Sequence, residues 1–303
     1  MRIIDFELRL STRNLKEWGI KKSLLIRLMD EHGAVGFGEI APLPGRSIET
    51  FDEVQKTTIE MGKGLLKGNF QLFPLPPSIL FGFSSALNDL AERPASSSFT
   101  MTHLSFENEP PLDRFLHVKI KASPSVEETE ERIRGWLKFG AKVRVDINEK
   151  WDLGELIAFV NRFEMGELLY VEDPVPFRLL DYFASQTHVS IAIDKTLGIV
   201  PLDIILAKKS VTHLIIKPTL IGGQRQCYEI AAKAIQANKQ VVYSSAMEGL
   251  VGLSHIVRMG GENPFGVDTL KRFEDNPLPG EESFNQGKLN DPVPYFECMQ
   301  KFF

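Results

Sequence analysis

The chain has 303 residues, 43% of them hydrophobic and 25% charged, which is the composition of a globular protein of one or two domains. Its 35 Lys and Arg residues against 40 Asp and Glu residues give a formal net charge of −5, which argues against a nucleic-acid partner. The two cysteines, Cys227 and Cys298, have no paired spacing and predict neither a zinc site nor a disulfide framework. With no signal peptide and no apolar run of about 18 residues, we expect a cytoplasmic protein without a membrane partner.

Residues 1–95 predict an α+β domain. Residues 33–47 are rich in Gly and Pro and are predicted to form a loop that carries Glu39 and Arg46. Alternating and helical apolar patterns predict two strands and two helices around this loop. These strands and helices are expected over residues 2–10, 22–30, 48–67 and 84–92.

A repeated unit fills residues 96–275. Each repeat has a short apolar strand, a polar residue at the end of that strand and then, in most cases, an amphipathic helical pattern. Eight such strands connected by helices predict an α/β barrel of the (β/α)7β type, whose last helix is missing. An open doubly wound sheet is the structural alternative, but its glycine-rich phosphate turn is not found here. We expect residues 276–303 to pack against the first domain. The strands are predicted over residues 99–106, 117–122, 142–147, 168–173, 190–194, 213–218, 240–245 and 265–270.

The polar residues at the strand ends recur every 22 to 27 positions along the chain. In a parallel barrel the carboxyl ends of all strands meet at one face, where such barrels place their active sites. We therefore expect these side chains to converge on one pocket. They are Lys121, Asp146, Glu172, Asp194, Lys217, Ser244 and Asp268.

Three of these residues, Asp146, Glu172 and Asp194, are carboxylates on successive strands. Carboxylates that are buried together repel one another and need a cation. Their all-oxygen chemistry favours Mg²⁺, with Mn²⁺ as a substitute, over zinc. The sequence therefore predicts a magnesium site.

Two lysines of one strand, Lys119 and Lys121, share a face because side chains alternate along a strand. Their like charges and partial burial are expected to lower a lysine pKa enough to give a neutral base. Lys217 lies at the end of the sixth strand and is expected across the metal from them. A divalent cation between lysines suits removal of a proton next to a carboxylate.

The ordered segments KIK, VDIN, VEDP, AIDK and IIKPT resemble the enolase superfamily, in its muconate-lactonizing subgroup. The segments GEIAPLPGRSIET, IIKPTLIGG and YSSAMEGLVGLSHIV are similar, more narrowly, to the o-succinylbenzoate synthase family. The resemblance implies that residues 1–95 and the tail form a capping domain over the barrel. Two positions depart from the family pattern: Asp173 in VEDP and Lys195 in AIDKT stand where glutamates are common.

The resemblance also implies a reaction, the Mg²⁺-dependent syn dehydration of 2-succinyl-6-hydroxy-2,4-cyclohexadiene-1-carboxylate to o-succinylbenzoate on the route to menaquinone. In that reading Lys121 removes the α-proton and then protonates the leaving hydroxyl. Lys217 stabilises the enediolate from the opposite face, and Lys119 supports Lys121. N-succinylamino acid racemase or dipeptide epimerase activity on the same site is one alternative, and a non-catalytic ligand-binding barrel is another.

Four further residues are candidates for contact with the carboxylate substrate: Arg46, Arg144, Ser244 and Ser245. Arg144 shares a strand face with Asp146, although a structural salt bridge explains it equally well. The two serines are equally well explained as caps of the next helix. Neither oligomeric state nor substrate breadth follows from the sequence.

Overall fold

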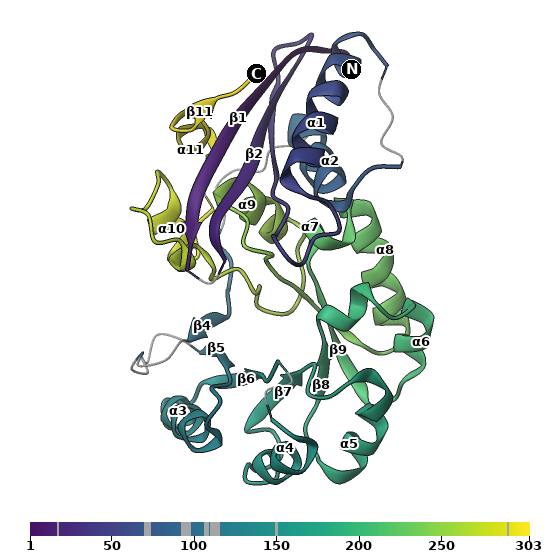
Figure 1. Cartoon of the computed structure of the whole chain (residues 1–303), viewed down its shortest axis with the longest axis vertical. Coiled ribbons are helices and arrows are strands. Elements are labelled where there is room, and N and C mark those ends of the chain that lie inside the picture. The colour runs from purple at the N-terminus through teal and green to yellow at the C-terminus, as the bar shows by residue number, and fades with distance from the viewer. Residues whose placement is uncertain are drawn as a thin grey trace.

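The computed structural model describes residues 1–16, 18–69, 74–91, 98–105, 109, 116–148, 151–289 and 291–303. Figure 1 shows an antiparallel sheet flanked by two helices at one end and a curled parallel sheet with peripheral helices at the other. The predicted architecture, a modified α/β barrel with an α+β capping domain, is confirmed.

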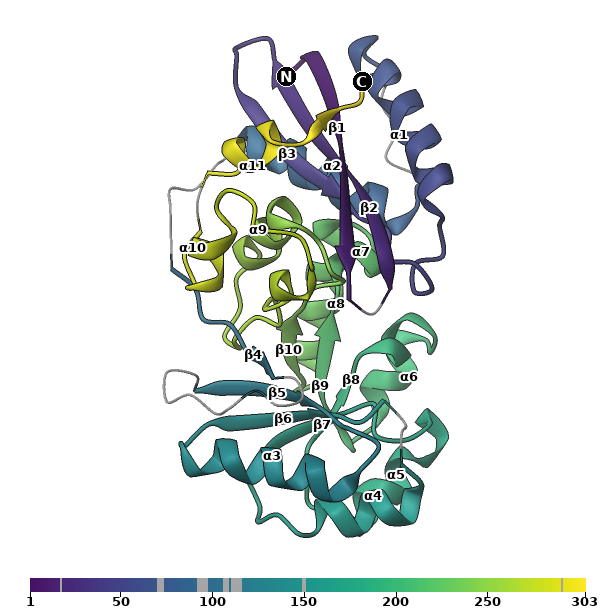
Figure 2. The same ribbon diagram turned by 60° about the vertical axis from the view of Figure 1, so that its left-hand side comes forward.

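The antiparallel sheet has the strand order β11-β1-β2-β3. Its strands are β1 (Ile3–Leu15), β2 (Gly19–Asp30), β3 (Val35–Ile40) and β11 (Gln300–Lys301). The last of these pairs antiparallel with β1, so the two ends of the chain share one sheet. Figure 2 shows the C-terminal segment lying across β1. No helix in the described part of the chain is long and apolar enough to cross a membrane.

The predicted loop over residues 33–47 is wrong in its first half, because Val35–Ile40 forms strand β3. Its two glycines serve close packing rather than a turn. A Cβ atom at Gly36 would lie 2.1 Å from the carbonyl oxygen of Ala86, and one at Gly38 would lie 2.0 Å from that of Gly82. The helix that carries Ala86 and Gly82 therefore packs directly on the backbone of β3.

That helix is α2 (Pro77–Ala91), and it begins several residues before the predicted start at residue 84. Proline is tolerated in the first turn of a helix, where its missing N–H would have no partner anyway. The proline-rich segment therefore starts the helix. The other helix, α1 (Phe51–Leu66), agrees with the prediction and begins with a capping box between Thr50 and Glu53.

The parallel sheet has the strand order β10-β9-β8-β7-β6-β5-β4. Seven predicted strands are confirmed, and the eighth is an extended segment with isolated bridges. Phe265 pairs with Met101 before β4, and Gly266 pairs with Ser244 after β10, which closes the ring. The strands are β4 (His103–Ser105), β5 (His117–Lys121), β6 (Lys142–Asp146), β7 (Leu168–Glu172), β8 (Ile191–Ile193), β9 (Val211–Ile216) and β10 (Gln240–Tyr243).

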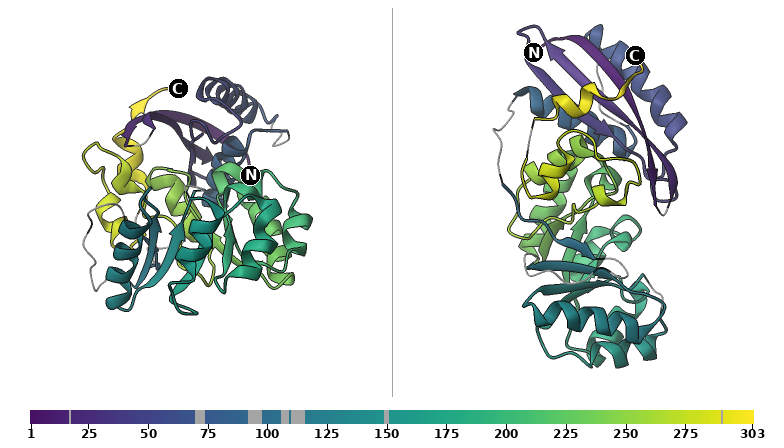
Figure 3. Two further views of the ribbon diagram at one scale, coloured as in Figure 1. Left: turned by 60° about the horizontal axis from the view of Figure 1, so that its bottom comes forward. Right: turned by 90° about the vertical axis from the view of Figure 1, so that its left-hand side faces the viewer.

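Helices cover the outer face of this sheet (Figure 3). The barrel core and part of the cap form one buried cluster, because Leu25 of β2 and Phe37 of β3 pack with the barrel residues. The helices are α3 (Val126–Lys138), α4 (Leu153–Val160), α5 (Leu180–Gln186), α6 (Leu202–Ala207), α7 (Pro218–Ile221), α8 (Gly223–Gln236), α9 (Leu250–Arg258), α10 (Glu281–Asn285) and α11 (Val293–Glu297). Short 3-10 turns are η1 (Phe177–Leu179), η2 (Lys195–Gly198) and η3 (Leu270–Arg272).

Candidate active site

A cavity of about 260 Å³ lies at the carboxyl ends of the barrel strands, where the capping domain meets them. It brings together most of the residues that the strand-end spacing predicted, from β5, β6, β8, β9 and β10 with their loops and from the segment that closes the ring. Arg46 reaches it from the capping domain. The predicted residues that line it are Arg46, Lys119, Lys121, Asp146, Asp194, Lys217, Ser244, Ser245 and Asp268.

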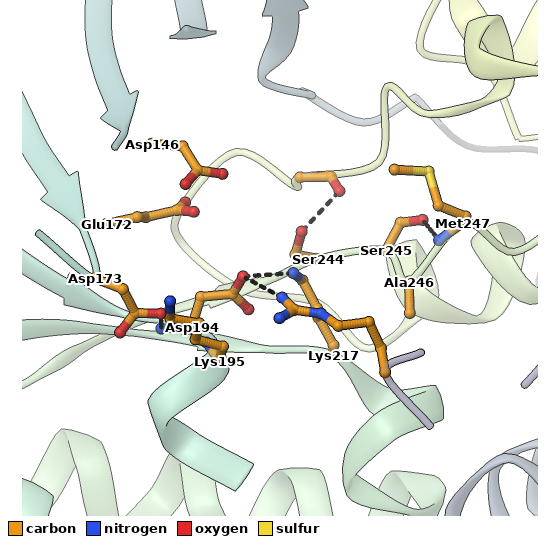
Figure 4. A network of polar contacts seen from close by, with 12 residues as sticks. Asp146, Glu172, Asp173, Asp194, Lys195, Lys217, Ser244, Ser245, Ala246 and Met247 are labelled. Carbon is orange, nitrogen blue, oxygen red and sulfur yellow. Dashed lines mark hydrogen bonds and ion pairs between the residues drawn. The ribbon is translucent and has the colours of Figure 1, made fainter. Parts of the chain in front are cut away.

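The three carboxylates follow one another around the ring. Asp146 ends β6, Glu172 ends β7, and Asp194 follows β8. Figure 4 shows the carboxylates of Asp146 and Glu172 side by side, with Asp194 on the neighbouring strand. Glu172 is deeper than the other two, since its side chain is 3% exposed against 12% for each of them. The lining of the cavity does not include Glu172.

The two lysines of β5 have different partners. The Nζ atom of Lys119 lies 2.9 Å from a carboxylate oxygen of Asp146 and also contacts Glu172. Lys121 has no ion pair among the described residues, and its Nζ atom lies 5.9 Å from the ring centre of Trp18. Lys119 is therefore held by carboxylates, while the amino group of Lys121 faces the cavity.

These surroundings move the two lysine pKa values in opposite directions. Burial lowers the pKa of Lys119, but the carboxylates of Asp146, Glu172 and Asp194 raise it well above its usual value. Burial lowers the pKa of Lys121, and the positive charge of Lys119 lowers it further. Of the two lysines of β5, therefore, only Lys121 has the lowered pKa that the sequence predicted, and a lowered pKa suits a base.

Lys217 follows β9, so the three carboxylates lie between it and Lys121 in the order of the strands. Its Nζ atom lies 2.6 Å from a carboxylate oxygen of Asp194, and Arg46 approaches the same oxygen to 3.9 Å. A dashed line in Figure 4 joins Lys217 to Asp194. Burial raises the pKa of Asp194, but the charges of Lys217 and Lys119 outweigh it and leave the pKa lowered. Cations thus reach this carboxylate from both the barrel and the cap.

The donor chemistry of the site fits a hard divalent cation. Burial, together with the repulsion of Asp146 and Asp194, raises the pKa of Glu172 to about 7, although the charge of Lys119 opposes the rise. Among the described residues, no group of three or more Asp, Glu, His or Cys side chains is arranged to hold a metal ion. Instead, the ammonium groups of Lys119 and Lys217 contact the three carboxylates. A bound cation would have to displace Lys119 or Lys217 from part of these contacts.

Asp173, one of the two departures from the family pattern, supports the turn that carries Asp194. Its buried carboxylate accepts hydrogen bonds from the backbone N–H groups of Asp194 and Lys195, at 3.2 and 2.7 Å. Burial raises the pKa of Asp173, and the charge of Asp194 raises it further. Figure 4 shows Asp173 beside both residues. The aspartate at this position therefore fixes the backbone of the turn that follows β8.

Ser244 and Ser245 line the cavity and do not cap the following helix, which begins after Gly249. Ser244 donates to the carbonyl oxygen of Gly266 at 2.9 Å, across the seam of the ring. The hydroxyl of Ser245 accepts from the N–H of Met247 at 2.8 Å and contacts Thr269. The serines thus shape the loop around Met247, which has a left-handed backbone with φ of 64°.

Arg144 does not line this cavity, although its alternation with Asp146 made it a candidate. Its guanidinium lies deeper in the barrel, against His117 and Tyr170. Asp268 does line the cavity, but its carboxylate is held by the N–H of Leu104 and by Lys271. We assign it to the closure of the ring.

Sequence reasoning missed two groups of residues. Trp18 and Asn148 line the cavity, and the position of Asn148 two residues after Asp146 was an available signal. The other group is a buried contact between the cap and the barrel, made by Lys21 and Glu39. The Nζ atom of Lys21 donates to the carbonyl oxygen of Met247 at 2.6 Å.

Glu39 of β3 accepts hydrogen bonds from the N–H groups of Gly249 and Gly252, both at 2.9 Å, and so caps helix α9 across the domain boundary. Replacing Glu39 with alanine leaves these buried groups without partners. We expect the free energy of unfolding to fall by about 3 kcal/mol, measured by urea denaturation. The exposed Glu60 of α1 is the control, and Glu60→Ala should leave it within about 0.5 kcal/mol of the starting protein. Equal stability of the two variants would contradict this role.

Comparison with known proteins gives matches to both the cap and the barrel. Residues 111–287 match the enolase C-terminal domain-like family, and residues 4–90 match the family described as MenC, N-terminal domain. An o-succinylbenzoate synthase of Escherichia fergusonii is 30% identical over 256 residues, which cover 78% of this chain and 79% of the relative.

Solved structures agree on the fold. An o-succinylbenzoate synthase from Thermosynechococcus elongatus, complexed with Mg in its active site, aligns with a TM-score of 0.72 at 22% identity and covers 93% of this chain and 98% of its own. A dipeptide epimerase from Enterococcus faecalis aligns with a TM-score of 0.74 at 20% identity and covers 92% and 94%. At these identities the two structures support the fold alone.

Proposed function

The chain belongs to the o-succinylbenzoate synthase family of the enolase superfamily, and we propose that it catalyses the syn dehydration of 2-succinyl-6-hydroxy-2,4-cyclohexadiene-1-carboxylate to o-succinylbenzoate. The observation that carries this proposal is the placement of three carboxylates between Lys121 and Lys217 around the ring. Relatives named o-succinylbenzoate synthase also support it. We further propose that the product enters menaquinone biosynthesis.

We propose that Asp146, Glu172 and Asp194 hold Mg²⁺. Carboxylate oxygens are the ligands that Mg²⁺ prefers, and a divalent cation would offset the repulsion among the three negative charges. When bound, Mg²⁺ stabilises the negative charge that develops on the substrate carboxylate. Asp173 keeps the backbone of Asp194 in place for this role.

Lys121 is the proposed acid and base. Its amine, with a lowered pKa, takes the α-proton as the C–H bond breaks. The same ammonium group then gives a proton to the leaving hydroxyl on that face, so that the C–O bond breaks, water leaves and the new double bond makes the ring aromatic. Lys119 does not transfer protons in this scheme, because Asp146 and Glu172 hold it as a cation beside Lys121.

Lys217 is proposed to face the substrate from the other side, where its positive charge stabilises the enediolate. Arg46, Ser244 and Ser245 are the proposed contacts for substrate carboxylates, because all three line the cavity. Arg46 comes from the capping domain, and its contact with the substrate would help to exclude water from the site.

The test is a direct assay with the cyclohexadiene substrate. With Mg²⁺ present, we expect the ultraviolet absorbance of the diene to disappear as the aromatic product forms. Excess EDTA should lower the rate by at least about 10³-fold, and added Mg²⁺ should restore it. No turnover of this substrate with Mg²⁺, by protein whose fold is verified by circular dichroism, would refute the proposal.

Epimerisation of dipeptides or N-succinylamino acids is the second candidate, because lysines lie on both sides of the carboxylates and a dipeptide epimerase shares the fold. Such a reaction removes a proton on one face and returns one on the other. Solvent deuterium entering the α-carbon of these substrates faster than the cyclohexadiene is dehydrated would make it the better assignment.

A further inference from the structure

A second pocket lies at the N-terminal ends of the barrel strands, away from the candidate active site. We call it the basic pocket after three of its lining residues, His117, Lys142 and Arg144. His117 begins β5 and Lys142 begins β6, while Arg144 is the third residue of β6. The loop of residues 260–265 lines another side. The proposed reaction uses none of these residues.

Arg144 forms the inner wall of the basic pocket, and it is 1% exposed. Its two terminal nitrogens lie 3.4 Å from Nδ1 of His117, and its guanidinium carbon lies 5.5 Å from the ring centre of Tyr170. Its Nε atom is buried without a hydrogen-bond partner. No carboxylate among the described residues forms an ion pair with Arg144, whereas a buried cation ordinarily requires one.

The groups around Arg144 cannot supply the missing negative charge. Burial and the charge of Arg144 lower the pKa of His117, and they lower that of His213 to about 4, so both rings are neutral near pH 7. The carboxylates one layer above, Asp146 and Glu172, are already paired with Lys119.

We propose that the basic pocket binds a small oxyanion, with Arg144 as its buried donor. The free Nε–H and the adjacent N–H groups of an arginine match two oxygens of one anion. Lys142 is exposed and adds attraction, and the Nε2–H of His117 is a further donor because its Nδ1 accepts from Arg144. Glu262 is the acidic residue in the lining and is exposed, so solvent screens its charge.

Inorganic phosphate, with sulfate and acetate in parallel, is the probe, and the imidazole signals of the six histidines are the readout. Titration at constant ionic strength, with phosphate replacing chloride, should shift the His117 signal saturably and raise its pKa. His117→Gln identifies the signal. Saturation by phosphate and sulfate assigns a tetrahedral oxyanion, whereas tighter saturation by acetate assigns a carboxylate. Both results support the proposal.

Arg144→Met should weaken phosphate binding by about tenfold or more, as expected when a charged donor is lost. If Arg144→Met does not fold, the test uses Lys142→Met, at an exposed position. This variant should weaken phosphate binding about threefold or more. Arg225→Met, on the exposed face of α8, is the matched control and should bind as the starting protein does. The proposal is overturned if chloride shifts the His117 signal as much as the three anions do, or if none of the three anions shifts it. It is also overturned if Arg144→Met folds and binds phosphate with full affinity, or if Arg144→Met does not fold and Lys142→Met binds with full affinity.

Discussion

Lys121→Ala is expected to lower kcat for the dehydration by about 10³-fold or more, because the variant has no group to take the α-proton. The cavity otherwise keeps its carboxylates and its cations Lys119 and Lys217, so KM should change little. Steady-state rates across several pH values provide the measurement. In the starting protein, kcat/KM should rise with pH towards the lowered pKa of Lys121 and then level off. Alanine should remove this rise.

The control for this variant is Lys209→Ala, an exposed lysine between α6 and β9, which should keep the full rate. A rise in melting temperature on adding Mg²⁺ to Lys121→Ala would show that the carboxylates still bind metal. If Lys121→Ala retained a rate within tenfold of the starting protein, another residue would have to be the base. Lys119 would then be the residue to replace next.

Glu172→Gln is expected to separate stability from function. The variant loses one of three proposed metal ligands, so we expect Mg²⁺ to bind at least about 10²-fold more weakly and kcat/KM to fall by about 10³-fold or more. Without metal, however, the variant should be at least as stable as the starting protein. The amide can still accept from Lys119, and one of three mutually repelling charges is gone.

Thermal unfolding with and without Mg²⁺ measures both effects. The melting temperature of the starting protein should rise with Mg²⁺, while that of Glu172→Gln should not. Glu164→Gln, at an exposed position four residues before the same strand, is the matched control and should behave as the starting protein does. A metal-free Glu172→Gln protein that melted far below the starting protein would show that this carboxylate mainly holds Lys119 in place.

The sequence predicted correctly those parts of the molecule in which residues of one type recur at regular spacing. Strand ends recur at nearly equal spacing, and a barrel converts that spacing into one pocket, so Lys121, Asp146 and Asp194 could be placed together. Strand β3 and the start of α2 were missed because Gly and Pro are also the residues typical of turns. Gly36 instead allows a helix to pack closely on a strand, and Pro77 instead begins a helix.

The contacts between cap and barrel could not be predicted in this way. Glu39 meets Gly249 across 210 positions, and Lys21 meets Met247 across 226. No local pattern marks such a pair, because each residue alone resembles a surface charge. Arg144 shows the limit of strand alternation in another way. The alternation of side chains along β6 could not indicate that Arg144, two residues before the strand end, lies too deep in the barrel to reach the cavity.

The pairing of β11 with β1 has a consequence for how the protein is made. Residues 300 and 301 complete the edge of a sheet that begins at residue 3, and Phe265 closes a ring that begins at Met101. On the ribosome, therefore, the ring of the barrel cannot close before residue 266 has been synthesised, and the sheet of the cap cannot be completed before residue 301. Such long-range closure slows folding and leaves partly formed sheets exposed. Loss of residues 300 and 301 would therefore leave β1 as an open edge of the cap sheet, although these residues lie far along the chain from the carboxylates.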